Sequence, residues 1–337
     1  MSDDRPIAPS VWSDRAFLLG LSILGGSYVV LILALLTADL FFTSRGDLLE
    51  ALAKPEIRYA IKLSVISCTV TAVLAMWVAV PLGYLLARTR FPGREVVDTI
   101  LDIPIVLPPL VIGLSLLILF QMAPGKAIEE VTRRHIGTVF VYVLLPLILA
   151  VPLTALMTRT LLGRLAATPV VAVSLAGILS FTVGPDWAGF VQQRLHTRIT
   201  YAIPSVIIAQ FAVATAFAVR TMRITFEQIP ARTEHVALTL GCTRAQAFWL
   251  ITLPQARRGM LTAATLAWAR SLGEFGPILI FSGATRLKTE VLSTSVFLEL
   301  SIGNLNAAIA VSILMVIVAV CVLVLMRLFG LRGTGLV

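Results

Sequence analysis

Long apolar runs without charged side chains constrain this chain more than any other sequence feature. Seven runs of at least 21 residues contain no Asp, Glu, Lys or Arg: Ala16–Ala38, Leu63–Ala87, Ile103–Gly125, Ile136–Thr158, Leu165–Pro185, Ile199–Val219 and Leu300–Met326. An eighth stretch, Gly259–Thr285, is interrupted only by Arg270 and Glu274. Because about 20 apolar helical residues cross the roughly 30 Å hydrocarbon core of a bilayer, these runs predict an all-α, polytopic transmembrane helical bundle of about eight helices.

Composition excludes several other classes of protein. The chain is 58% hydrophobic and 13% charged, whereas soluble domains average about 45–50% apolar and about 25% charged residues. Its three cysteines lie far apart with no C-x-x-C spacing, so neither a disulfide framework nor a metal site is predicted. No long Lys/Arg run accompanies the net charge of +9, so nucleic acid is not an expected partner.

The basic residues instead predict the orientation of the chain in the membrane. With the N-terminus in the cytoplasm, 15 of the 27 Lys and Arg residues lie inside, 11 lie outside and Arg270 lies within a span. The positive-inside rule therefore favours a multi-pass protein of the cell (inner or plasma) membrane with cytoplasmic N- and C-termini, surrounded by the lipid bilayer. One of the two proline-containing runs, the fourth or the fifth, could instead be re-entrant or lie in the interface.

The chain has no motif that predicts catalysis. Gly125-Lys126 is the only Gly-Lys pair, and it lacks the glycine and the Ser/Thr of a P-loop. H-E-x-x-H, G-x-S-x-G and paired intramembrane carboxylates are also absent. We therefore expect a protein that is not an enzyme and that holds no cofactor or metal of its own.

The segment between the sixth run and the Gly259–Thr285 stretch predicts two short helices joined by a bend. Gly241 is typical of the position just after a helix, Thr243 can cap the next helix, and Pro254 should stop that helix before the following span. The second helix is unusually apolar for a solvated loop, with Ala247, Phe248, Leu250 and Ile251. It could lie on the bilayer surface or dock on another protein.

This segment resembles the EAA loop of the permease subunits of ATP-binding-cassette importers. The family pattern is Glu-Ala-Ala, three residues, Gly, nine residues, Ile, one residue and Leu-Pro. The second half matches at Gly241, Ile251, Leu253 and Pro254, which places His235, Val236 and Ala237 on the Glu-Ala-Ala positions and Glu234 one position early. The resemblance implies that nine residues couple the chain to an ATPase: Glu234, His235, Val236, Ala237, Gly241, Phe248, Ile251, Leu253 and Pro254.

A second resemblance concerns the residues around the two intramembrane charges. The segment from Ala267 to Gly276, A-W-A-R-S-L-G-E-F-G, is similar to a block of the molybdate, tungstate and sulfate permeases, as are Val80–Gly93 and Leu107–Pro109. The resemblance implies a fold like that of type I ABC importer permeases, with a core of about six helices and two inserted spans. The expected domains are an N-terminal tail, first transmembrane helix and external loop at 1–58, followed by a permease transmembrane domain at 59–330. The permease domain includes an inserted region at 121–198 and a cytoplasmic coupling loop at 224–258.

The same resemblance implies a function and a set of partners. The chain would be the permease subunit of an importer for a tetrahedral oxyanion, molybdate first and tungstate or sulfate next, working by alternating access. Its partners would be two copies of a cytoplasmic ATP-binding subunit, which would bind ATP and Mg²⁺, a second permease subunit forming a homodimer, and an external (periplasmic) substrate-binding protein.

Arg270 and Glu274 are the only charged residues deep in a predicted span, where charge is costly. Their i,i+4 spacing lets them neutralise each other as a structural pair. Alternatively, they line a translocation pathway together with Ser271, Gly273, Phe275 and Gly276. A competing function is a secondary transporter or channel in which Asp102, Arg270 and Glu274 form an ion or proton relay; otherwise Asp102 is interpreted as a carboxylate at a helix start.

Small residues give the Gly259–Thr285 stretch, which is the seventh predicted span in chain order, two further expected properties. Gly259, Ala263, Ala267 and Ser271 recur at every fourth position and predict close helix packing, for which a partner helix of the same chain is a simpler interpretation than a second copy. Gly273, Gly276 and Pro277 should weaken the helix near Glu274, either as a kink or as a break that lines a cavity.

Overall fold

The computed structural model describes residues 11–139 and 199–332, and all regular elements within these two ranges are helices. The first range contains α1 (Val11–Phe42), α2 (Arg45–Ala53), α3 (Pro55–Arg88), α4 (Arg94–Val106), α5 (Pro109–Gln121) and α6 (Ala123–Val139). The second contains α10 (Ile203–Gln228), α11 (Ala231–Thr239), α12 (Arg244–Ala247), the π-helical turn η2 (Phe248–Thr252), α13 (Leu253–Gln255), α14 (Arg257–Leu272), α15 (Gly276–Phe281), α16 (Leu292–Ser301) and α17 (Leu305–Arg332). The expected all-α architecture is confirmed.

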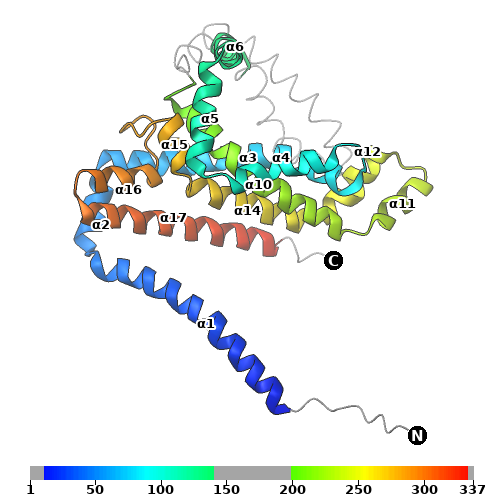
Figure 1. Cartoon of the computed structure of the whole chain (residues 1–337), viewed down its shortest axis with the longest axis horizontal. Helices are drawn as coiled ribbons and strands as arrows, with labels where there is room; N and C mark the ends of the chain where they lie inside the picture. The colour runs from blue at the N-terminus through cyan, green and yellow to red at the C-terminus, as the bar shows by residue number, and fades with distance from the viewer. Residues whose placement is uncertain (1–10, 140–198, 333–337) are drawn as a thin grey trace.

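Three helices, α3, α10 and α14, lie side by side at the centre of the body (Figure 1). Their contacting faces are rich in alanine, and Ala75, Ala214 and Ala267 are fully buried. A Cβ atom at Gly83 of α3 would lie only 2.8 Å from the Met222 Cβ of α10. Membrane helices approach this closely where small residues replace larger side chains, so van der Waals contact between backbones holds this core together.

The small-residue stripe of α14 is used within the chain, as expected. Ala263, Ala267 and Ser271 are fully buried, and a Cβ atom at Gly259 would overlap Thr225 Cγ2 of α10. The stripe therefore serves packing against neighbouring helices of the same chain.

Four of the predicted spans are confirmed as single long apolar helices: α1, α3, α10 and α17. The last begins at Leu305 instead of Leu300, because Gly303 adopts a positive φ of 79° in a turn after α16. The predicted boundary between residues 58 and 59 falls within the first turn of α3. The predicted span Leu165–Pro185 lies outside the described residues, as does Ile136–Thr158 beyond Val139.

The third predicted span, Ile103–Gly125, is not one straight helix. Helix α4 ends at Val106, α5 begins at Pro109, and the two meet at an angle of 111°. The cause is local, because Pro108 follows Leu107 and forces it into an extended conformation with ψ of 141°. As a result Asp102 lies within α4, and its interpretation as a helix-start carboxylate is wrong.

The seventh predicted span is broken as its glycines and proline suggest. Helix α14 ends at Leu272, three residues follow without helical structure, and α15 runs from Gly276 to Phe281. The broken helices meet each other: a Cβ atom at Gly113 of α5 would lie 2.7 Å from the Cα of Pro277 in α15. Helices α5 and α15 therefore pack almost backbone to backbone, at the end of the body away from α11 (Figure 1).

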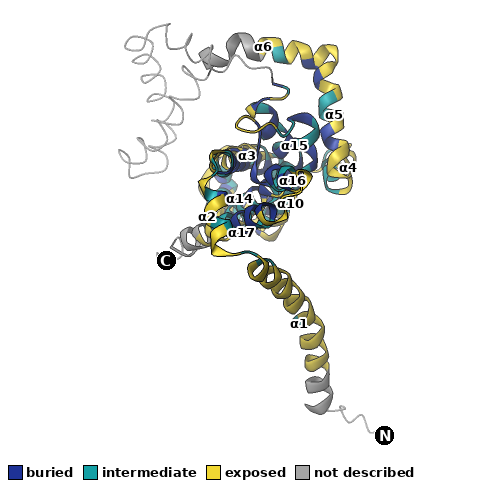
Figure 2. Ribbon diagram, turned by 90° about the vertical axis from the view of Figure 1, so that its left-hand side faces the viewer, coloured by how far each residue is buried: buried dark blue, intermediate teal, exposed yellow. Residues whose placement is uncertain are grey.

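Helix α1 stands apart from this body. Figure 2 shows it extending away from the other helices with exposed residues along its length, and none of its most apolar 18-residue window is buried. A helix with this composition is stable in lipid without protein contacts, so α1 is suited to the bilayer itself.

Candidate coupling and translocation sites

Helix α11 ends in the turn that Gly241 predicts. Gly241 has a φ of 90°, its N–H donates to the Leu238 carbonyl at 3.1 Å, and the Cys242 N–H donates to the Ala237 carbonyl at 3.0 Å. These paired bonds form a Schellman motif, in which a left-handed residue satisfies the last helix carbonyls. Only glycine adopts this conformation at low cost, which explains its place in the sequence.

The second short helix begins at Thr243, as predicted. The Thr243 Oγ1 accepts from the Gln246 N–H at 3.3 Å, and the Gln246 Oε1 accepts from the Thr243 N–H at 2.8 Å. This reciprocal pair is a capping box, which satisfies two backbone donors at the start of α12.

Replacing Thr243 with alanine is expected to loosen α12 without unfolding the protein. Loss of an N-cap hydroxyl costs about 1 kcal/mol, so backbone amides of residues 244–247 should exchange with deuterium about fivefold faster. Hydrogen exchange followed by mass spectrometry measures this change. Thr262→Ala, which removes an exposed hydroxyl bonded to the Arg258 carbonyl within α14, should leave those amides unchanged. Equal exchange in both variants would contradict a capping role.

The predicted stop at Pro254 is displaced along the chain. The backbone remains helical through Pro254, and the interruption falls at Ala256. A π-helical turn precedes the proline, with the Leu253 N–H donating to the Phe248 carbonyl five residues earlier. The wider turn rearranges the hydrogen bonds where the proline supplies no N–H, so the helix continues past it.

Glu234 ties the two short helices to the end of α3. Its carboxylate accepts a hydrogen bond from the Tyr84 hydroxyl at 3.0 Å and pairs with the Arg88 Nε at 2.9 Å. Arg88 also donates to the Ile229 carbonyl at 2.6 Å. The sequence pattern does not indicate this anchor, because Tyr84 and Arg88 lie 150 and 146 positions before Glu234 in the chain.

Several of the predicted coupling residues face the protein itself. The Phe248 ring lies 4.6 Å from that of Tyr84 and 6.4 Å from that of Phe226, measured between ring centroids. Ala237 and Ala247 are buried. Ala247 therefore supplies little surface for a partner, whereas Phe248 is half-buried and packs on Tyr84 and Phe226 of the same chain.

The exposed apolar surface of this region comes from four other side chains. Val236, Leu240, Trp249 and Leu250 are 50%, 80%, 45% and 37% exposed, and we call these four residues the coupling face. His235 is exposed beside them, whereas Ile251, Leu253 and Pro254 are half-buried. Leu240 and Trp249 were not predicted. Leu240 precedes the left-handed glycine, where a Schellman turn leaves the side chain outside the helix.

The two intramembrane charges form an ion pair. The Arg270 Nη1 lies 2.9 Å from the Glu274 Oε1, and the Arg270 guanidinium lies 5.4 Å from the centroid of the Phe217 ring. The Glu274 side chain is 1% exposed, whereas that of Arg270 is 31% exposed. The pair neutralises the buried carboxylate, and the accessible part of the guanidinium can still meet an anion.

The other predicted pathway residues surround the break between α14 and α15. Ser271 and Gly276 are buried, Gly273 is exposed, and the half-buried Phe275 ring lies 5.2 Å from that of Phe297. The structure thus brings all six predicted residues to one broken helix, with exposed positions next to fully buried ones.

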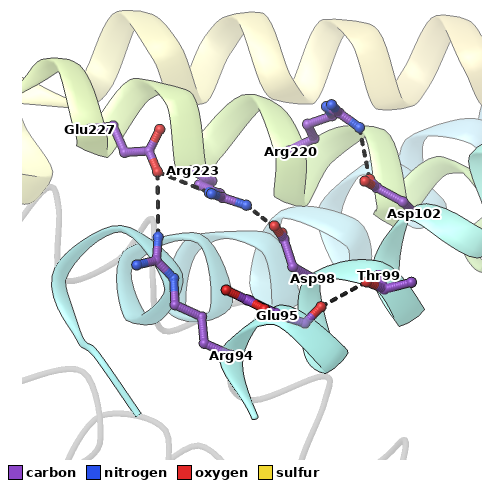
Figure 3. A network of polar contacts seen from close by, with 8 residues as sticks. All are labelled: Arg94, Glu95, Asp98, Thr99, Asp102, Arg220, Arg223 and Glu227. Carbon is purple, nitrogen blue, oxygen red and sulfur yellow. Dashed lines mark hydrogen bonds and ion pairs between the residues drawn. The ribbon is translucent and has the colours of Figure 1, made fainter. Parts of the chain in front are cut away.

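Asp102 belongs to a different cluster, near the C-terminal end of α10. Figure 3 shows four acidic side chains, Glu95, Asp98, Asp102 and Glu227, among three arginines of α4 and α10. The Arg220 Nη1 pairs with Asp102 at 2.8 Å, and Arg223 pairs with both Asp98 and Glu227. These ion pairs therefore hold α4 against α10. Among the described residues, Asp102 pairs with Arg220 and not with Arg270 or Glu274.

A second buried carboxylate cluster ties the loop after α15 to α16. Glu299, whose side chain is 1% exposed, pairs with Arg286 at 2.9 Å and lies 3.6 Å from the Lys54 Nζ. Nearby Glu290 accepts a hydrogen bond from the Ser295 hydroxyl at 2.8 Å, and burial raises the pKa of its carboxyl group. The cluster fixes this loop against the start of α3.

Known proteins are similar to this chain in sequence and in fold. The family model described as binding-protein-dependent transport system inner membrane component matches residues 79–332. The sulfate transport system permease protein CysT of Escherichia coli K12 is 26% identical over 295 residues, 87% of this chain and 84% of that protein. The molybdate/tungstate transport system permease protein WtpB of Pyrococcus abyssi is 26% identical over 258 residues, 76% of this chain and 74% of that protein.

A solved structure supports the fold. The crystal structure of a bacterial ABC transporter involved in the import of the acidic polysaccharide alginate matches with a TM-score of 0.61 at 17% identity, covering 96% of this chain and 99% of that chain. The family match includes α4, α5, the coupling face and both halves of the broken span. The chain therefore belongs to the binding-protein-dependent transport system inner membrane components, the permease subunits of ABC importers.

Proposed function

We propose that this chain is the membrane-spanning permease of an ATP-driven importer for a tetrahedral oxyanion. The observation that carries the proposal is the coupling face, an exposed apolar surface on the short helices between α10 and α14. Glu234 of α11 anchors these helices to Arg88 of α3. Apolar side chains grouped on an otherwise polar loop are typical of a docking surface. The membership of the chain in the permease family supports an ATPase as the docked partner.

The named relatives support the substrate class. Permeases described for sulfate and for molybdate or tungstate share 26% of their residues with this chain over most of its length. All three ions are tetrahedral and doubly negative, and Arg270 can offer such an ion a partly exposed guanidinium. Molybdate is the first substrate to test, followed by tungstate and sulfate.

The assembly we propose has three kinds of component. Two copies of this chain form the transmembrane pathway, two cytoplasmic ATPase subunits dock on the coupling faces, and a binding protein delivers the oxyanion from outside. Both termini of the chain lie in the cytoplasm. ATP and Mg²⁺ bind to the ATPase subunits.

Contacts among the described residues support a way for movement of the ATPase subunits to reach the broken helix. When ATP closes the ATPase pair, a displacement of α11 acts on α3 through the Glu234–Arg88 pair. Helix α3 packs on α10 and α14, and α14 carries Arg270 next to the break. The pathway then opens to alternate sides of the membrane, because closing the ATPase pair and binding the oxyanion favour different arrangements of the same helices.

Charged substitutions on the coupling face are expected to weaken ATPase binding more than tenfold. Leu240→Asp and Trp249→Asp would each place a carboxylate in an apolar contact, where burying an unpaired charge is costly. Copurification with the candidate ATPase, together with the thermal unfolding of the permease, measures the effect.

Thr239→Asp is the matched control, since it adds the same charge to an exposed polar position of the same loop. Unchanged ATPase binding by Leu240→Asp and Trp249→Asp would contradict docking at this face. Oxyanion uptake that continues without ATP hydrolysis would instead indicate a secondary transporter.

A further inference from the structure

The break in the seventh span leaves backbone carbonyls that need hydrogen-bond donors. In an unbroken helix the Ser271 carbonyl would accept from the Phe275 N–H, and the Glu274 carbonyl from the Ile278 N–H. Within a membrane protein, carbonyls freed at a break must find other donors, because the hydrocarbon core supplies none. The identity of those partners shows how the break is held.

Gln210 of α10 supplies a donor on one side of the break. Its amide Nε2 donates to the Ser271 carbonyl at 3.2 Å, while its Oε1 accepts from the Thr71 hydroxyl at 3.2 Å. Gln210 is 1% exposed, so both ends of its amide are satisfied inside the protein. Burying an amide between helices is unfavourable unless its hydrogen bonds are made, and here they are made to the last turn of α14.

Ser293 of α16 supplies a donor on the other side. Its Oγ donates to the Glu274 carbonyl at 2.7 Å. The Glu274 side chain points back to Arg270, whereas its carbonyl is held by α16. Ser293 thus supplies a donor at the Glu274 carbonyl, and Gln210 adds a second donor at the Ser271 carbonyl, which also accepts from the Glu274 N–H at 3.2 Å.

We propose that Gln210 and Ser293 are positioning residues. They stabilise the break between α14 and α15 and thereby fix the position of the Arg270–Glu274 pair. This inference rests on the proposed function in assigning that pair to the translocation pathway. Neither residue contacts the transported ion. Each acts through a backbone carbonyl, so its loss changes the conformation of residues 272–276 while leaving the packed core intact.

The reactivity of a cysteine at position 273 tests this proposal in the full-length chain. Gly273 is exposed, and an added Cβ would find its nearest atom, the Arg270 carbonyl oxygen, at 3.8 Å. In a background with Cys242→Ser and Cys321→Ser, Gly273→Cys is labelled with a charged methanethiosulfonate reagent. Cys68 stays in place, because it is fully buried.

Gln210→Met keeps the length of the side chain but removes the donor, and Ser293→Ala removes the hydroxyl. Each is expected to change the labelling rate about fivefold, as the loss of one buried hydrogen bond predicts. Ser293→Thr keeps a hydroxyl and should restore the parental rate. Ser312→Ala, which removes a hydroxyl bonded to the Ala308 carbonyl within α17, is the matched control and should leave the rate unchanged.

Parental labelling in both Gln210→Met and Ser293→Ala would overturn the proposal, as would a lower unfolding temperature with an unchanged rate. If Gln210→Met does not accumulate, the comparison of Ser293→Ala with Ser293→Thr decides the outcome. The labelling needs neither ATP nor an oxyanion. A changed rate in a chain that transports no oxyanion would therefore support these positioning roles while contradicting the proposed function.

Discussion

Arg270→Gln is expected to destabilise the chain by about 3 kcal/mol or to prevent its assembly, because it leaves a buried carboxylate without its partner. The Glu274 side chain is 1% exposed, and its carboxylate lies 2.9 Å from the Arg270 guanidinium. Thermal unfolding of the purified chain and its yield in the membrane fraction measure this loss. The reciprocal change, Glu274→Gln, should cost less, since the Arg270 side chain is 31% exposed and therefore less buried than the Glu274 carboxylate.

The double variant Arg270→Gln/Glu274→Gln separates a structural pair from a pathway pair. Removing both charges removes the unpaired group, so unfolding temperature and yield should return close to those of the parent. If the pair lines the pathway, the double variant assembles but transports no oxyanion. Full transport by an assembled double variant would show that the pair serves packing alone, and failure of the double variant to recover would contradict the electrostatic account.

Glu234→Gln is expected to cost about 2 to 3 kcal/mol and to abolish ATP-driven uptake, because it leaves Arg88 nearly buried beside a neutral amide. The Arg88 and Glu234 side chains are 13% and 11% exposed, so little water compensates the lost pair. Thermal unfolding reports the first effect, and the uptake of molybdate per ATP hydrolysed reports the second.

The neighbouring His235→Gln is the control for this experiment. His235 occupies the position of the family's motif glutamate and is exposed, so its replacement should leave the unfolding temperature unchanged. If His235→Gln lowers the unfolding temperature as much as Glu234→Gln does, the anchor is not the Glu234–Arg88 pair. Normal uptake by Glu234→Gln would contradict the proposed route of movement through α3.

Much of this fold could be predicted because its signals are local. The apolar runs that became α1, α3, α10 and α17 are long enough to decide their own structure in a membrane. The turn at Gly241 and the cap at Thr243 also depend on neighbours within a few residues. Such features need no knowledge of which helices pack together.

The parts that were not predicted have two kinds of cause, a local break in the chain and contacts between distant segments. The apolar run Ile103–Gly125 suggested one span, although Pro108 and Pro109 within it already disfavour a continuous helix. The direction of Phe248 is set by Tyr84 and Phe226, which come from α3 and α10. Periodicity places an apolar residue on a face of its helix but does not say whether that face meets the protein, the lipid or a partner.

The close contact between Gly113 and Pro277 limits how this permease can move. Backbones this close cannot slide past each other without a clash, so the contact couples the movement of α5 to that of α15. A non-helical link precedes each of the two helices: Leu107–Pro108 before α5 and residues 273–275 before α15. On the other side of these links, ion pairs hold α4 against α10, and helix packing holds α14 against α10. The two broken helices therefore have to change position together.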